Sequence, residues 1–233
     1  MPAQSCKIIL FDLDGTLLET SAEIADALND TLADLALAPV EQSRVDAWIG
    51  HGTRALLVQA LALRWGVSEA EVLQSSRLPQ AEAAFSAHYL RRCGTRSRPY
   101  PCVPEVLQAL RLSGVQLAIV TNKESRYVQR LLDAHGMSSW FDRVVCGDTF
   151  EFKKPNPQGV TACLVEFGVA PEQALFVGDS SIDIATARRA GVPVWAVPYG
   201  YNLGQPIEAS APDRVIADVS ALMPQSSSTR FGG

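Results

Sequence analysis

Carboxylates are the first residues of this sequence whose spacing could do chemistry. Asp12 and Asp14 stand two positions apart after the apolar run ILF, and Asp179 and Asp183 stand four apart after the apolar run ALFVG. Acids gathered at one place repel one another and raise each other's pKa unless a cation shares them. Oxygen ligands without His or Cys favour a hard ion. The pattern therefore predicts a divalent cation among these acids.

Several residues of this sequence could bind phosphate beside the acids. Gly15 comes directly after Asp14, and its backbone freedom lets the chain turn sharply with amide N–H groups facing an anion. Thr121 and Asn122 end another run and add donors, and Lys154 adds a cation on a flexible stem. A few carboxylates beside a phosphate favour Mg²⁺, which keeps several of its waters. We therefore expect a phosphate site next to Mg²⁺.

This combination of groups suits phosphoryl transfer. A carboxylate beside a metal and a phosphate group can attack phosphorus, which gives an aspartyl-phosphate that water later hydrolyses. Asp14 can protonate the leaving oxygen and then take a proton from the attacking water. Asp179 or Asp183 alone would be interpreted as a helix cap. Together with the acids at 12 and 14, they favour the catalytic interpretation.

The acids lie at the ends of segments that are typical of parallel strands. Apolar, β-rich runs alternate with helical patterns, which predicts a doubly wound α/β fold with a parallel sheet covered on both faces. Ligands bind beyond the carboxyl ends of the strands in such sheets. The polar segments are therefore expected to converge on one edge. The runs are KIILF, VQLAIVT, RVVCG, ALFVGD, VPVWAV and RVIA, with helices between them such as 124–135 and 157–167.

One segment interrupts this alternation. From about Ser21 to Arg92 the apolar residues recur three or four apart, which is typical of helices. We therefore expect a Rossmann-like α/β core of residues 1–20 and 95–224 and an inserted all-helical cap domain of residues 21–94. The polar residues 225–233 predict a flexible tail.

Composition and charge limit the classes of function. The 233 residues are 47% hydrophobic and 19% charged, as in globular proteins with a sizeable core. The net charge of −5 argues against nucleic acid or membrane partners, so we expect a small phosphorylated metabolite instead. Scattered cysteines and histidines predict reduced thiols and no zinc site. The sequence shows no leader segment and no membrane-spanning stretch, so we expect a cytoplasmic protein. We also expect a monomer or a homodimer.

The motifs together resemble one known family. DLDGT, then Thr121, then Lys154 and GDSSID, in this order and around a helical insert, are similar to the motifs of the haloacid dehalogenase superfamily of phosphatases over nearly the whole chain. The resemblance implies that Asp12 is the nucleophile and a metal ligand. It also implies that Asp14 is the acid/base and binds the metal through its carbonyl. Thr121 would hold the phosphate, and Lys154 would stabilise the charged intermediate.

The resemblance also assigns the remaining metal ligands and the lysine. Asp179 would ligate Mg²⁺, and Asp183 would support the waters of the metal. Lys153 and Lys154 are adjacent, and spacing alone does not choose between them. Similar family members place the lysine directly before a proline, as in Lys154-Pro155, which favours Lys154. Lys153 is then expected to be a solvated surface charge.

The inserted helices fall where this superfamily carries a cap that excludes water and reads the leaving group. WIGHGTRALLVQAL, VTNKE and PYGYNLGQPI resemble segments of phosphoglycolate phosphatases, which implies hydrolysis of 2-phosphoglycolate to glycolate and phosphate. His51, Gly52 and Arg54 could meet the carboxylate of that substrate. Alternatively, this segment is a helix entry with Thr53 as its cap and Arg54 in solvent.

Other activities stay open. Similar proteins act on sugar phosphates or pyrophosphate, and a phosphomutase related to β-phosphoglucomutase would share the core residues. A dehalogenase is disfavoured because such relatives lack the acid found here as Asp14. A nucleotide-binding Rossmann protein would need G-x-G-x-x-G after the first strand. A non-catalytic module that binds a phosphorylated ligand would be expected to lose Asp12, Asp14 or Asp179.

Overall fold

A parallel β-sheet forms the centre of the computed structural model, which describes residues 6–224. The sheet has 6 strands in the order β5-β4-β1-β6-β7-β8, and all neighbouring strands are parallel. The order places β1 in the middle, with crossovers to both sides, as in doubly wound folds. The predicted fold class is confirmed. The strands are β1 (Ile8–Phe11), β4 (Gln116–Val120), β5 (Arg143–Val145), β6 (Ala174–Gly178), β7 (Val194–Ala196) and β8 (Arg214–Val215).

Both faces of this sheet are buried. Alternate residues of β1 belong to different apolar clusters, Ile9 and Phe11 to one and Ile8 and Leu10 to the other, and all four are 0% exposed. This two-sided burial explains the near-continuous apolar runs of the sequence. The flanking helices are α6 (Val103–Leu112), α7 (Ser125–Ala134), α8 (Gln158–Phe167) and α9 (Ser181–Arg189), with short 3₁₀ helices η2 (Pro171–Gln173), η3 (Ile207–Ser210) and η4 (Val219–Leu222).

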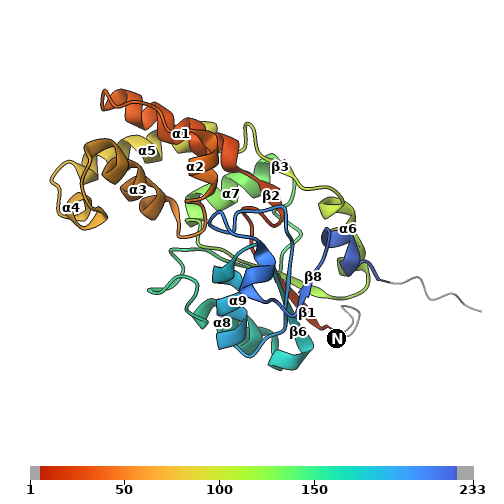
Figure 1. Ribbon diagram of the computed structural model, residues 1–233. Coiled ribbons are helices and arrows are strands. Elements are labelled where there is room, and N and C mark those ends of the chain that lie inside the picture. The colour runs from red at the N-terminus through yellow and green to blue at the C-terminus, as the bar shows by residue number, and fades with distance from the viewer. Residues whose placement is uncertain (1–5, 225–233) are drawn as a thin grey trace, which may run out of the picture.

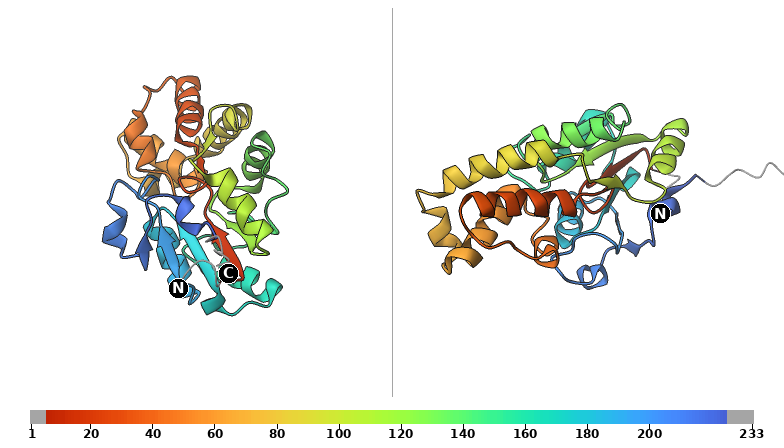
Figure 2. Two further views of the ribbon diagram at one scale, coloured as in Figure 1. Left: turned by 90° about the vertical axis from the view of Figure 1, so that its right-hand side faces the viewer. Right: turned by 90° about the horizontal axis from the view of Figure 1, so that it is seen from above.

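Five further helices gather at one end of the molecule, and we call them the cap helices. Figures 1 and 2 show them, from three sides, in red to yellow beside the sheet. The division at residues 21–94 stays a prediction, and the predicted tail at 225–233 lies outside the described residues. Across residues 6–224, no helix has the length and apolar character needed to cross a membrane. The cap helices are α1 (Ser21–Asp34), α2 (Gln42–Asp46), α3 (Thr53–Trp65), α4 (Glu69–Leu73) and α5 (Leu78–Arg92).

The chain enters and leaves the cap helices through a short antiparallel ribbon. Its strands are β2 (Leu18–Glu19) and β3 (Arg98–Pro99). Glu23, at the start of α1, is 0% exposed and accepts backbone N–H groups from Gly94 at 3.0 Å and Ser97 at 3.0 Å. This buried carboxylate fastens the incoming helix to the outgoing segment. The cap helices are thereby held beside the carboxyl ends of the central strands.

Candidate active site

The loop after β1 carries the first predicted site residues. The N–H of Asp12 donates to the carbonyl of Val177 at 3.0 Å, so strand pairing continues as far as Asp12. The chain then turns, and the N–H of Gly15 donates to the carbonyl of Leu18 at 2.9 Å. Gly15 has φ +85°, and a Cβ atom there would collide with the carboxylate of Asp179. A glycine at this position therefore allows the loop to approach Asp179 closely.

Three acids meet at this edge of the sheet. Carboxylate oxygens of Asp12, Asp179 and Asp183 lie within 4.8 Å of one another. Nζ of Lys154 lies 2.7 Å from Oδ1 of Asp12 and 2.7 Å from Oδ1 of Asp183. Asp12 follows β1 and Asp179 follows β6, which are neighbours in the sheet. The order of the strands thus brings together acids that stand more than 160 positions apart in the sequence.

Burial and like charge disfavour the ionised form of these carboxylates. Burial is the largest cause of the raised pKa of Asp12, which reaches about 6 although Lys154 opposes the rise. Burial, followed by the charges of Asp183 and Asp12, also raises the pKa of Asp179. Burial disfavours the charge of Lys154, but its two carboxylate partners outweigh this and raise its pKa. One lysine does not neutralise three carboxylates, so the cluster attracts a further cation.

Asp179 and Asp183 have different surroundings. Asp179 accepts a hydrogen bond from Oγ1 of Thr16 at 2.6 Å and another from the N–H of Tyr201 at 2.6 Å. Asp183 is more heavily engaged, because Oδ2 accepts from the N–H of Asp179 at 3.2 Å and from both N–H and Oγ of Ser180. Its other oxygen faces Lys154. This environment suits the supporting role predicted for Asp183 better than direct ligation.

The donor set fits a hard divalent cation. Only carboxylate oxygens make up the cluster found within residues 6–224, and no His or Cys joins it. Hard ions such as Mg²⁺ and Ca²⁺ prefer such oxygen ligands. Asp12 and Asp179 are the acids best placed to bind the ion, while Asp183 is held by its other partners. The raised pKa values of Asp12 and Asp179 show that their negative charges are unfavourable without a cation, which a bound ion would offset.

Asp14 turns away from the acid cluster toward a buried lysine. Nζ of Lys123 donates to both carboxylate oxygens of Asp14 at 2.9 Å, and Oγ1 of Thr20 donates to Oδ1 at 2.6 Å. No role for Lys123 was predicted from the sequence. Two signals could have found it: it directly follows Thr121 and Asn122 at the carboxyl end of β4, and it lies in the segment VTNKE that carries the family resemblance. Thr20 was missed because it lies in the connection to the cap helices.

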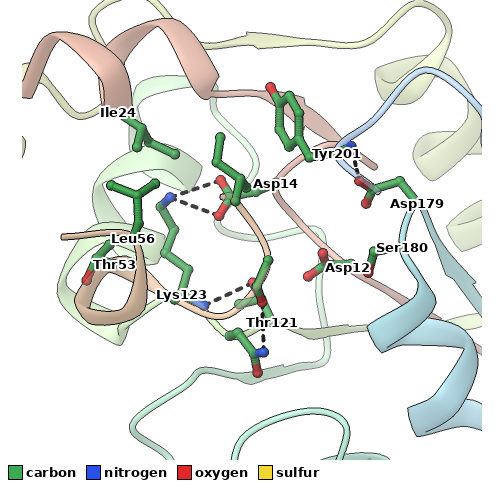
Figure 3. Close-up of a pocket in the computed structure, with 14 residues that line it drawn as sticks. Asp12, Asp14, Ile24, Thr53, Leu56, Thr121, Lys123, Asp179, Ser180 and Tyr201 are labelled. Atoms are coloured by element: carbon green, nitrogen blue, oxygen red, sulfur yellow. Dashed lines mark hydrogen bonds and ion pairs between the residues drawn. The ribbon is translucent and has the colours of Figure 1, made fainter. Parts of the chain in front are cut away.

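A small cavity lies between the strand ends and the cap helices. Figure 3 shows Asp12, Asp14 and Asp179 facing it, with Ile24 and Leu56 on its cap side. Its volume is about 30 Å³. This is room for roughly two water molecules at about 10–15 Å³ each, so a larger ligand enters only if the cap opens. The lining consists of Asp12, Asp14, Ile24, Ile49, Gly50, Gly52, Thr53, Leu56, Thr121, Asn122, Lys123, Asp179, Ser180 and Tyr201.

Comparison with known proteins identifies the family. Residues 9–197 match the family model of haloacid dehalogenase-like hydrolases. The chain belongs to this family. The resemblance inferred from the motifs is therefore confirmed, and the cavity at the strand ends is the candidate active site of a haloacid dehalogenase-like hydrolase.

Relatives of this hydrolase cover almost the whole chain. A phosphoglycolate phosphatase of Pseudomonas putida is 38% identical over 223 residues, which are 96% of this chain and 80% of that protein. A phosphoglycolate phosphatase of Aliivibrio fischeri is 38% identical over 220 residues, 94% of this chain and 96% of that protein. A crystal structure from Haemophilus somnus, described as a predicted phosphoglycolate phosphatase, superposes with a TM-score of 0.86 at 34% sequence identity. The match covers 93% of this chain and 96% of that chain.

Two predicted substrate-binding residues of this hydrolase lie outside the cavity. Nε of Arg54 is 2.6 Å from Oε1 of Glu82, and the Arg54 side chain is 59% exposed. His51 is exposed and does not line the cavity either. Gly52 does line it, next to Thr53 at the start of α3. The substrate-binding roles of Arg54 and His51 stay predictions, and the ion pair with Glu82 would have to open for Arg54 to take part.

The loop residues Asn122 and Lys153 also have structural partners. Nδ2 of Asn122 donates to the carbonyls of Gly50 at 2.9 Å and Lys154 at 3.1 Å, and its Oδ1 accepts from the N–H of Lys154 at 2.8 Å. Its side chain therefore joins a cap loop to the loop that carries the buried lysine. Nζ of Lys153 lies 3.5 Å from Oε1 of Glu124, away from the acid cluster. This geometry favours Lys154 over Lys153.

Proposed function

We propose that the protein hydrolyses 2-phosphoglycolate to glycolate and phosphate through an aspartyl-phosphate on Asp12, with Mg²⁺ as its metal. One observation carries this proposal: the buried carboxylate of Asp12, paired with Lys154 and crowded by Asp179, borders a cavity of about 30 Å³. The names of the relatives support the substrate, since several are phosphoglycolate phosphatases at 35–38% identity. The cavity is smaller than even this substrate, so the cap must open to admit it.

The first step transfers the phosphoryl group to the protein. A carboxylate oxygen of Asp12 attacks phosphorus while the bond between phosphorus and the glycolate oxygen breaks. Asp14 gives its proton to that oxygen, so glycolate leaves as an alcohol. Lys154 lies between Asp12 and Asp183 and offsets the negative charge that gathers around the transferred group. Thr121, which lines the cavity, holds a phosphoryl oxygen.

The second step returns the protein to its starting state. A water molecule attacks phosphorus, the bond from phosphorus to Asp12 breaks, and Asp14 takes the proton that the water loses. Asp12, Asp179 and the carbonyl of Asp14, with Asp183 in support, would hold Mg²⁺, which would supply positive charge to offset the charge of the transferred group. The apolar side chains on the cap side exclude bulk water from the reacting atoms.

A phosphate-release screen tests this function. The purified protein is given 2-phosphoglycolate, sugar monophosphates, nucleotides and pyrophosphate with Mg²⁺ and then with EDTA, and Asp12→Asn serves as the inactive control. We expect kcat/KM to be highest for 2-phosphoglycolate by roughly tenfold or more, and activity to vanish with EDTA. A sugar phosphate or pyrophosphate as the best substrate would overturn the assignment. Formation of an isomeric sugar phosphate without phosphate release would indicate a phosphomutase.

The proposed function also includes the kind of substrate, the cellular location and the oligomeric state. The substrate is a small phosphorylated metabolite, and the net charge of −5 gives no attraction to nucleic acid or anionic membranes. We propose that the enzyme works in the cytoplasm as a monomer or homodimer. Light scattering after size-exclusion chromatography measures the oligomeric state.

A further inference from the structure

The carboxylate of 2-phosphoglycolate needs a positive partner in the closed cavity. This inference rests on the proposed function, which gives the substrate an anionic group at each end. The phosphate end has Lys154 and the metal site. A second anion enclosed with apolar side chains binds well only if a cation accompanies it, because burial of an unpaired charge is strongly unfavourable.

The positive side chains near the cavity have different partners. Arg54, the candidate suggested by the sequence, pairs with Glu82 and is exposed. Lys153 pairs with Glu124. Lys123 is the one cationic side chain that lines the cavity within residues 6–224. Position alone therefore singles out Lys123 among the candidates.

The surroundings of Lys123 hold its ammonium group at a fixed point. The residue is 3% exposed, and Nζ lies 4.8 Å from the centroid of the Tyr89 ring of α5. The same Nζ lies 2.9 Å from both carboxylate oxygens of Asp14. The ammonium group is thus bound by a carboxylate already. A carboxylate of a ligand at the same place would meet hydrogen-bond donors that the fold already holds in position.

The chemistry of the substrate brings its carboxylate to this point. In 2-phosphoglycolate a single methylene separates the ester oxygen from the carboxylate. Asp14 must reach the ester oxygen to protonate it, and Lys123 touches Asp14. A group in contact with Asp14 is therefore also within reach of the carboxylate. Ile24 and Leu56 line the same cavity and can pack against the methylene, which strengthens the ion pair by excluding water.

We propose that the ammonium group of Lys123 binds the carboxylate of 2-phosphoglycolate and makes the enzyme select this substrate over phosphate esters that lack a carboxylate. In the complex, the substrate carboxylate takes over part of the contact that Asp14 has in the structure. Asp14 keeps its hydrogen bond from Thr20 at 2.6 Å and turns toward the ester oxygen. Lys123 is then a determinant of specificity, in addition to being a partner of Asp14.

Binding of two phosphonates tests this role without turnover. 3-Phosphonopropionate has the shape and both charges of 2-phosphoglycolate, with CH₂ in place of the ester oxygen. Propylphosphonate has a methyl group in place of the carboxylate. Isothermal titration calorimetry with Mg²⁺ measures both ligands on the wild type, on Lys123→Met and on the matched control Lys153→Met. We expect the wild type and the control to prefer 3-phosphonopropionate by about 10- to 100-fold, as for a hydrogen-bonded ion pair.

The ratio of the two affinities decides the proposal. In Lys123→Met the preference should fall to within about threefold of unity, because no charge then meets the carboxylate. A preference that survives in Lys123→Met would overturn the inference and leave Lys123 as a partner of Asp14 only. If circular dichroism shows that this variant does not fold, Lys123→Gln, which keeps donors toward Asp14 without the charge, replaces it under the same criterion.

The same data separate this inference from the proposed function. If wild-type protein prefers neither phosphonate and does not hydrolyse 2-phosphoglycolate, the substrate assignment itself fails. If the wild type hydrolyses 2-phosphoglycolate and prefers 3-phosphonopropionate, and Lys123→Met keeps that preference, the substrate assignment stands and the role of Lys123 fails. Loss of the preference in Lys123→Met alone supports both.

Discussion

Replacing Asp12 by Asn removes one charge from a buried cluster of three carboxylates, two of which contact the single lysine Lys154. The pKa of Asp12 rises from 3.8 to about 6, with burial as the largest cause. At about 1.4 kcal/mol for each tenfold change in proton affinity, this rise corresponds to about 3 kcal/mol of folding stability. The opposing attraction of Lys154 is already included, and Lys154 keeps Asp183 as a partner. Asp12→Asn should therefore stabilise the metal-free protein.

The stability advantage of Asp12→Asn should depend on pH. The folded protein binds a proton at Asp12 more tightly than the unfolded chain does, because the pKa is higher in the folded state. Wild-type stability from this group is complete below the unfolded pKa and is lost as the pH rises through about 6. Asn carries no such charge. The advantage of Asp12→Asn should be near zero at about pH 4 and reach about 3 kcal/mol at about pH 8.

Urea unfolding in EDTA measures the difference. Free energies of unfolding are determined at both pH values for the wild type, for Asp12→Asn and for the control Glu151→Gln, which removes an exposed carboxylate. Mg²⁺ at about 1,000 times its Kd should reverse the order at the higher pH, since it stabilises the wild type by about 4.1 kcal/mol, which exceeds the advantage of about 3 kcal/mol. The reasoning is refuted if Asp12→Asn is less stable than the wild type at the higher pH in EDTA, or if its advantage does not change with pH.

Four further substitutions probe other parts of the site. Asp14→Asn should lower kcat by about 10²–10⁴-fold with the fold intact, which steady-state kinetics and circular dichroism check together; normal kcat would remove Asp14 as the acid/base. Asp179→Asn should raise the Mg²⁺ concentration for half-maximal activity more than Asp183→Asn does, whereas Asp183→Asn should lower the unfolding free energy by about 1–3 kcal/mol, since it breaks buried hydrogen bonds. Arg54→Ala should leave kcat/KM for 2-phosphoglycolate within about twofold if Arg54 serves only Glu82; a large fall would support the substrate role predicted from the sequence.

The acid cluster could be predicted from the sequence because it depends on the main chain. Asp12 and Asp179 directly follow apolar strands, and the carboxyl ends of parallel strands meet at one edge. Lys154 could be preferred over Lys153 only through a family resemblance. In the structure, Lys154 contacts two acids of the cluster and Lys153 contacts Glu124.

Side-chain partners far apart in the chain could not be predicted in this way. Arg54 pairs with Glu82, which lies 28 positions away on another cap helix, and no periodicity in the sequence connects the two. Lys123 meets Asp14 across 109 positions because β4 lies beside β1. Strand order places these two residues next to each other, and the contacts of Lys123 with Asp14 and with the Tyr89 ring set where the ammonium group lies.

Mapping the phosphoenzyme tests the central claim most directly. The wild-type protein is mixed with 2-phosphoglycolate that carries a radiolabelled phosphate and Mg²⁺, quenched in acid during the first turnover, and treated with borohydride, which reduces an acyl phosphate to homoserine. Peptide mass spectrometry then locates the modified residue. We expect labelled protein before reduction and homoserine at position 12 after it, with neither in Asp12→Asn. Turnover of 2-phosphoglycolate without labelled protein, or homoserine at another acid, would contradict it.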